Sequence, residues 1–67
     1  MISVHVSYQG KDSEVSVKPD AEVGEALEKA GINKETVIVR RGEEIVPDNE
    51  PLRDGDRIEV LRIISGG

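Results

Sequence analysis

The chain opens with two segments in which apolar and polar residues alternate. In residues 1–8 the even positions are apolar or aromatic: Ile2, Val4, Val6 and Tyr8. Residues 14–18 alternate again, through Val15 and Val17. Alternation with a period of two predicts half-buried strands. Residues 9–12 between them are typical of a turn, with Gly10 available for a positive φ, so the two strands are predicted to form an antiparallel hairpin.

The next stretch changes to the period of a helix. Pro19 stops the second strand, and Asp20 is a suitable N-cap for a helix over about residues 21–30. The apolar positions of this helix form one stripe, made of Val23, Ala26, Leu27 and Ala30. Gly31 is the residue expected just after a helix end. Gly24 lies inside the helix at a cost of about 1 kcal/mol relative to alanine, which indicates either close helix–sheet approach or simple tolerance.

Shorter elements follow in the second half of the chain. Residues 37–39 predict a third strand, and a turn at residues 41–42 leads into a fourth strand over residues 43–46. Pro47 ends that strand, because proline cannot donate to the ladder of a sheet.

A loop with turn-forming residues, DNEPLRDGD at residues 48–56, leads to the last strand. Leu52 is its expected apolar plug, and the aspartates of residues 54–56 are predicted to form a turn rather than a calcium loop, since their spacing is not that of an EF-hand. In the last strand Ile58 and Val60 are predicted to face the core. The opposite face is predicted to carry Glu59, Leu61 and Ile63.

One apolar helix stripe can cover one face of a sheet, so this order of elements predicts a two-layer α+β domain. Sixty-seven residues suffice for one small domain near the lower limit for independent folding. We assign residues 1–62 to that domain and residues 63–67 to an extended tail. Periodicity alone does not give the order of the strands in the sheet.

Composition excludes several classes of function. The chain has no cysteine, which removes disulfides, thiolate metal sites and iron–sulfur clusters. A net charge of −5 and a single aromatic residue, Tyr8, argue against nucleic acid as a partner. No apolar run approaches the roughly 20 residues of a membrane span, and no signal peptide is recognisable. We therefore expect a soluble, cytoplasmic protein that does not bind membranes and is a monomer when free.

Catalytic groups do not converge in this sequence. His5 is the only histidine and is predicted to lie partly exposed on a strand, between Ser3 and Ser7. The pair Glu43 and Glu44 is typical of solvated turn residues, and no glycine-rich phosphate loop occurs. The prediction is a protein that is not an enzyme and binds no cofactor or metal itself.

The chain ends in Gly66-Gly67, which a fold has little use for, because glycine loses the most conformational freedom on ordering. A frayed terminus or an expression remnant would also end in this way. The apolar strand runs directly into the glycines, however, which favours a tail that enters a narrow slot and presents its carboxylate. We assign Ile64, Ser65, Gly66 and Gly67 to the part that would enter a partner enzyme. Adenylation would make the carbonyl of Gly67 open to attack by sulfur or by an amine.

The pattern L-x-D-G-D-x-I-x-V followed by five residues and G-G runs from Leu52 to Gly67. It resembles the sulfur-carrier family, which includes the thiamine-pathway and molybdopterin-pathway carriers and the small archaeal ubiquitin-like modifiers. The resemblance implies a β-grasp fold, with a mixed sheet of four to five strands packed on one helix and the first and last strands parallel at the centre. It also implies that an adenylating enzyme uses ATP to activate Gly67, followed by a sulfur donor and a downstream sulfur-accepting synthase.

The resemblance leaves the pathway open among thiamine, molybdopterin and tRNA thiolation. Leu61-Arg62 resembles the modifiers, whereas Ser65-Gly-Gly resembles the molybdopterin carriers. One alternative is a protein modifier that is joined through Gly67 to lysines of other proteins. The chain's own lysines are predicted to be exposed, so self-linkage through Gly67 is also sterically possible. These are Lys11, Lys18, Lys29 and Lys34. A second alternative is an interaction module in which the two glycines have no function.

Other versions of this fold fit less well. The ferredoxin version needs cysteines, and an RNA-binding version needs a basic face, to which five arginines could contribute. These are Arg40, Arg41, Arg53, Arg57 and Arg62. Apolar residues on the outer face of the last strand instead predict a docking surface for the activating enzyme, formed by Leu61, Arg62 and Ile63.

Overall fold

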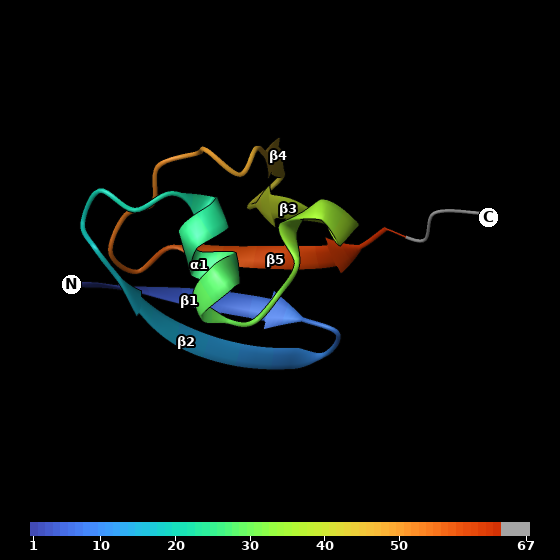
Figure 1. Cartoon of the computed structure of the whole chain (residues 1–67), viewed down its shortest axis with the longest axis horizontal. Coiled ribbons are helices and arrows are strands. Elements are labelled where there is room, and N and C mark those ends of the chain that lie inside the picture. Colours follow the sequence, from blue (N-terminus) through green and yellow to red (C-terminus); the bar gives the residue numbers. More distant parts are fainter. Residues whose placement is uncertain (64–67) are drawn as a thin grey trace.

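The computed structural model describes residues 1–63 of the chain, in which a mixed sheet is covered on one face by a helix (Figure 1). The elements are β1 (Ile2–Tyr8), β2 (Lys11–Val17), α1 (Val23–Lys29), the 3-10 helix η1 (Lys34–Thr36), β3 (Val37–Arg41), β4 (Glu44–Val46) and β5 (Arg57–Arg62). The strand order is β2-β1-β5-β3-β4. β1 and β5 run parallel, and the other neighbours are antiparallel. This arrangement confirms the two-layer α+β prediction and places β5 at the centre.

The predicted hairpin of β1 and β2 is present, with a tighter turn than expected. The strands pair from Ile2↔Val17 to Tyr8↔Lys11, so only residues 9–10 connect them. Both connecting residues have positive φ, 52° at Gln9 and 78° at Gly10. Two successive positive φ angles are typical of the two-residue turns whose twist matches that of the flanking strands. The expectation of a four-residue turn was therefore wrong, and β2 begins at Lys11.

The core lies between α1 and the inner face of the sheet. Its buried side chains are Val4, Val6, Val17, Ala21, Val23, Ala26, Leu27, Val37, Val39, Val46, Leu52, Ile58 and Val60. They include two of the four alternating positions predicted for β1, both positions predicted for β5 and three of the four residues of the helix stripe, while Ile2, Tyr8 and Ala30 are half-buried against this core. Leu52, 3% exposed, is the predicted apolar plug of the long loop.

The start of α1 differs from the prediction, because the helix begins at Val23 and not at residue 21. Asp20 is not its N-cap; that position belongs to Glu22, whose side chain makes no capping hydrogen bond. The chain before the helix is extended and pairs with the long loop. The Leu52 N–H donates to the carbonyl oxygen of Ala21 at 3.0 Å.

Backbone carbonyls of the same loop take the place of a capping side chain. The N–H of Val23 donates to the oxygen of Glu50 at 2.9 Å, and the N–H of Gly24 donates to the oxygen of Asp48 at 2.7 Å. The first N–H groups of a helix have no partner within it, so these contacts satisfy them. A Cβ on Gly24 would lie 3.2 Å from the oxygen of Asp48. Gly24 thus permits close approach of the helix to the loop, rather than to the sheet.

The end of α1 is as predicted. Gly31 has φ 76°. Its N–H donates to the oxygen of Glu28 at 3.1 Å, and the N–H of Ile32 donates to the oxygen of Leu27 at 2.9 Å. These two bonds define a Schellman motif, in which glycine is preferred because of the positive φ. Within residues 1–63 no helix has the length and apolar character needed to cross a membrane.

Candidate functional site

The candidate site is the C-terminal end of β5 with the surface around it, because this strand leads to the two terminal glycines. β5 is held on both sides, by β1 through pairs such as Val6↔Ile58 and by β3 through pairs such as Val39↔Val60. Ile58 is fully buried, and Val60 is 3% exposed. The strand that carries the tail is therefore fixed at the centre of the domain.

The final described contacts of this strand involve β3 and η1. Arg62 pairs with Val37, and the N–H of Ile63 donates to the carbonyl oxygen of Thr36 at 2.8 Å. The predicted tail residues Ile64, Ser65, Gly66 and Gly67 lie outside the described residues. β5 ends at Arg62, while the assignment of residues 1–62 to the domain and 63–67 to the tail stays a prediction.

The outer face of the sheet carries an apolar surface at this end. Leu61 and Ile63 are 40% and 44% exposed, which confirms the prediction that both are at least partly exposed. Leu61 pairs with Ile38 of β3, which is 39% exposed. Ile45 of β4 is 63% exposed and lies on the same face, since it pairs with Arg40, two residues from Ile38. We call Ile38, Ile45, Leu61 and Ile63 the apolar patch.

Sequence reasoning missed two members of the apolar patch, Ile38 and Ile45. Both have apolar neighbours in short strands, in the sequences VIV and EIV, so period-two alternation does not show which side chains face outward. The register with Leu61 reveals the outward direction of Ile38. Arg62, the third predicted docking residue, is exposed at the end of β5.

The D-G-D part of the sequence motif joins the start of β5 to β1. Asp54 Oδ1 accepts a hydrogen bond from the N–H of Ser3 at 2.8 Å. The N–H of Gly55 donates to the oxygen of Ser3, also at 2.8 Å, and Gly55 has φ 84°. This confirms the prediction that these residues form a turn. The positive φ gives a physical reason for glycine between the two aspartates.

The second aspartate of the motif stabilises the turn through its side chain and contacts β1 through its backbone carbonyl. Asp56 Oδ2 accepts from the N–H of Arg53 at 2.8 Å, and the oxygen of Asp56 accepts from the N–H of His5 at 2.8 Å. The motif therefore sets the register of the parallel pair, which begins at His5↔Arg57. Its role in these contacts is structural.

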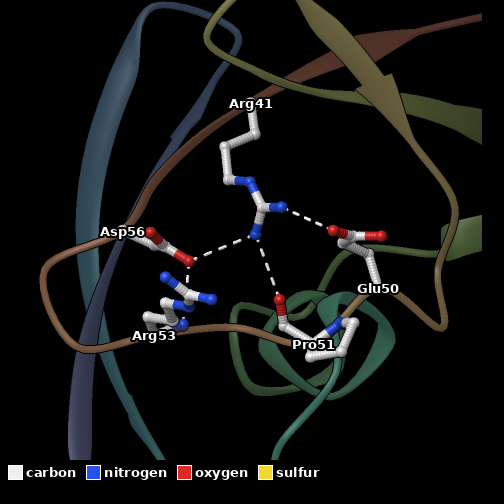
Figure 2. A network of polar contacts seen from close by, with 5 residues as sticks. All are labelled: Arg41, Glu50, Pro51, Arg53 and Asp56. Carbon is white, nitrogen blue, oxygen red and sulfur yellow. Dashed lines mark hydrogen bonds and ion pairs between the residues drawn. The ribbon is translucent and has the colours of Figure 1, made fainter.

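Figure 2 shows the guanidinium group of Arg41 between the long loop and the start of β5. Its Nη1 donates to the oxygen of Pro51 at 3.0 Å and to Asp56 Oδ2 at 3.3 Å, while Nη2 bonds the carboxylate of Glu50. The Arg41 side chain is 31% exposed. Sequence reasoning did not single out this network, because its members lie up to 15 residues apart with no periodic signal. Arg40, next in the strand, pairs with Glu59.

The remaining predicted polar residues are exposed or half-exposed. The His5 side chain is 44% exposed, with Nε2 3.7 Å from a carboxylate oxygen of Glu14, which confirms a partly exposed strand histidine. Among residues 1–63, no three histidine, aspartate or glutamate side chains gather in a way that could hold a metal ion. The lysines predicted to be exposed are so: Lys11, Lys18, Lys29 and Lys34.

The fold and the motif define a small β-grasp, ubiquitin-like domain, and known proteins extend that description. SAMP1 from Haloferax volcanii superposes with a TM-score of 0.75 at 22% identity, over 97% of this chain and 99% of that chain. Caldiarchaeum subterraneum ubiquitin superposes with a TM-score of 0.72 at 19% identity, over 98% of each chain. At such identities the likeness concerns the fold alone.

Sequence comparison is more specific. The model of the ThiS family matches residues 5–67. The sulfur carrier protein TtuB of Thermus thermophilus is 46% identical over 54 residues, which are 81% of this chain and 83% of that protein. The chain therefore belongs to the ThiS family, as its motif indicated. Membership of this family makes it a small protein carrier rather than an enzyme.

Proposed function

We propose that this chain is a sulfur carrier whose C-terminal Gly67 is activated and converted to a thiocarboxylate. The observation that carries the proposal is the family match, which extends through the Gly-Gly end, together with 46% identity to a protein described as a sulfur carrier. The position of β5 supports it, since the strand leading to Gly67 is anchored at the centre of the sheet. Such an anchor gives a short tail a rigid base.

The proposed chemistry proceeds in two steps on a partner enzyme. A carboxylate oxygen of Gly67 attacks the α-phosphorus of ATP, and pyrophosphate leaves. A sulfur nucleophile at the oxidation level of sulfide then attacks the glycyl carbonyl, AMP leaves, and a thiocarboxylate remains. Gly67 has no side chain, so neither face of its carbonyl is blocked. The chain itself supplies the carboxylate and its presentation, and ATP is bound by the partner.

We further propose that the adenylating enzyme docks on the apolar patch and Arg62. Leu61 lies on β5 and Ile63 directly follows the last residue of that strand, while Ile38 extends the apolar surface onto the neighbouring strand. An apolar surface next to the reacting end allows binding and delivery to be combined. A sulfur-accepting synthase would use the same end at the next step, and the chain would thus meet its partners in turn.

Intact-mass measurement tests the proposal. The purified chain is incubated with ATP, sulfide and the adenylating enzyme of its native cells. A mass increase equal to the replacement of one oxygen by sulfur, located at Gly67 by digestion, is the expected result. An unchanged mass in the presence of an enzyme that adenylates another carrier would contradict it. The accepting pathway then follows from which acceptor, a thiamine precursor, a molybdopterin precursor or a tRNA, removes the sulfur.

A protein modifier is the second candidate, because it would use the same activated end. Leu61-Arg62 and the four exposed lysines are compatible with this use. Digestion of proteins from native cells separates the two functions. A Gly67 remnant on lysines of other proteins indicates modification, and a free thiocarboxylate indicates sulfur carriage. Finding neither in cells that express the chain would leave the third possibility, an interaction module.

A further inference from the structure

The point where the tail begins is held by a short helix outside the sheet. η1 lies beside the C-terminal end of β5 (Figure 1, the short yellow-green coil). Its last residue, Thr36, accepts the hydrogen bond from the N–H of Ile63 at 2.8 Å. Ile63 is the final described residue, so this bond fixes the place from which residues 64–67 start. The tail base is thus tied to two segments, β3 through Arg62 and η1 through Ile63.

The start of η1 is capped by the side chain of Asn33. Asn33 Oδ1 accepts from the N–H of Glu35 at 3.0 Å. The carbonyl oxygen of Asn33 accepts from the N–H of Thr36 at 3.2 Å and from its Oγ1 at 3.0 Å. None of the three residues of η1 is buried, and its ion pair from Lys34 to Asp48 is exposed, so the turn depends mainly on these hydrogen bonds. An asparagine at the cap is a recognised device for ordering such a turn through its side-chain oxygen.

We propose that Asn33 is a positioning residue for the C-terminal glycine, acting through η1 and the Thr36 carbonyl. This inference rests on the proposed activation of Gly67. Four residues follow Ile63, and they can span at most about 14 Å when fully extended. A short reach leaves little slack, so a shift of its base displaces the reacting carboxylate. Misplacement by about 1 Å can cost up to about a hundredfold in rate.

The inference predicts a separation between binding and reaction. Three of the four members of the apolar patch, Ile38, Ile45 and Leu61, are held by strand pairing and not by η1, so docking of the adenylating enzyme should be largely preserved. Delivery of the carboxylate should become less precise. Loss of the Asn33 side chain should therefore lower kcat for adenylation and leave KM for the chain almost unchanged.

The first test needs no partner enzyme. Amide hydrogen exchange at Ile63 is compared in the wild-type chain, Asn33→Ala, Asn33→Asp and Lys34→Ala. Asn33→Ala should exchange faster, and Asn33→Asp should behave as wild type because a carboxylate oxygen also accepts the Glu35 N–H bond. Lys34→Ala is the matched control, since Lys34 is in η1 but pairs with Asp48 at 3.1 Å. Equal exchange at Ile63 in Asn33→Ala and wild type would overturn the inference.

The second test measures ATP–pyrophosphate exchange by the adenylating enzyme of the native cells, as a function of chain concentration. In Asn33→Ala we expect kcat to fall about three- to tenfold, the effect of one lost hydrogen bond, while KM changes less than about twofold. Asn33→Asp should restore kcat. If the wild-type chain supports exchange and Asn33→Ala has the same kcat, this inference is overturned while the proposed function stands. Absence of exchange with the wild-type chain would overturn the proposed function and, with it, this inference.

Discussion

At the scale of single residues, the sequence predicted the burial or backbone conformation of residues for which these depend on neighbours close in the sequence. The alternation of Val4 and Val6 predicted their burial, and a glycine after a helical stripe predicted the positive φ of Gly31. Arg41 could not be predicted in the same way. Its partners Glu50 and Asp56 meet it only because the long loop folds back over the end of β3 (Figure 2). Local pattern carries no information on such a contact.

Arg41→Ala should lower the free energy of unfolding by about 1–2 kcal/mol. The substitution removes the donor to the Pro51 oxygen and the cation beside two carboxylates, of which Asp56 keeps its bond from the Arg53 N–H, at a site where the side chains are only 21–31% exposed. Arg41→Lys should recover part of the loss, since an ammonium cannot reproduce the forked geometry. Urea denaturation measures both.

The neighbouring residue provides the control for this prediction. Arg40 pairs with Glu59, but their side chains are 45% and 44% exposed. Arg40→Ala should therefore change the free energy of unfolding by no more than about 0.5 kcal/mol. An equal loss of unfolding free energy in both variants would show that the Arg41 network stabilises the fold no more than the exposed Arg40–Glu59 pair does.

At the scale of elements, the type of each strand and helix and their order along the chain were predictable from the sequence. Their boundaries were less predictable. α1 begins two residues later than predicted because Ala21 and Glu22 pair with the long loop. The N-cap rule assumes that a side chain satisfies the first N–H groups. In α1 the backbone carbonyls of Asp48 and Glu50 do so, and their position beside the helix depends on the tertiary structure.

Gly24→Ala tests the weight of that tertiary contact against helix propensity. Propensity alone favours alanine by about 1 kcal/mol. The new Cβ would lie 3.2 Å from the Asp48 oxygen, a backbone atom that also accepts the Gly24 N–H bond at 2.7 Å. Because that carbonyl has little freedom to move, we expect a net loss of stability of about 1 kcal/mol. Thermal and urea unfolding check it.

A substitution at an exposed position of the same helix provides the control for Gly24→Ala. Glu28→Ala changes an exposed position of α1 without meeting the loop, so its stability should stay within about 0.5 kcal/mol of wild type. If Gly24→Ala raised stability instead, the loop would have to move away from α1 at small cost. Close approach of the loop would then not be the reason for glycine at this position.

At the scale of the whole molecule, the central strand of the sheet leads to the C-terminal glycine that we propose to be activated. The central strand, the parallel partner β1 and the D-G-D corner together fix β5, while the apolar patch lies on the opposite face from α1. Leu61 and Ile63 of this surface were predictable from strand parity. Ile38 and Ile45 were not, because periodicity does not encode the order β5-β3-β4, which places Ile38 beside Leu61 and Ile45 one strand further out.

Removal of Gly67 should separate binding from activation at this scale. The shortened chain should fold with a stability within a few tenths of a kcal/mol of wild type, since the core residues of the described part of the chain fall between Val4 and Val60. It should still bind the adenylating enzyme through the apolar patch, yet support no ATP–pyrophosphate exchange. Normal adenylate formation by the shortened chain would contradict the assignment of Gly67 as the reacting residue.

Leu61→Asp should give the opposite result, weaker binding with the reacting end intact. Leu61 is 40% exposed, so the loss of stability should stay within about 1 kcal/mol, while a charge in an apolar interface should raise the dissociation constant at least about tenfold. Ser16→Asp is the matched control, because Ser16 is exposed in β2, at the far edge of the same sheet. Calorimetric titration against the adenylating enzyme compares the three chains. A similar loss of affinity for both variants would indicate repulsion by added charge rather than docking at the apolar patch, and a large loss of stability for Leu61→Asp alone would mean that Leu61 belongs to the core.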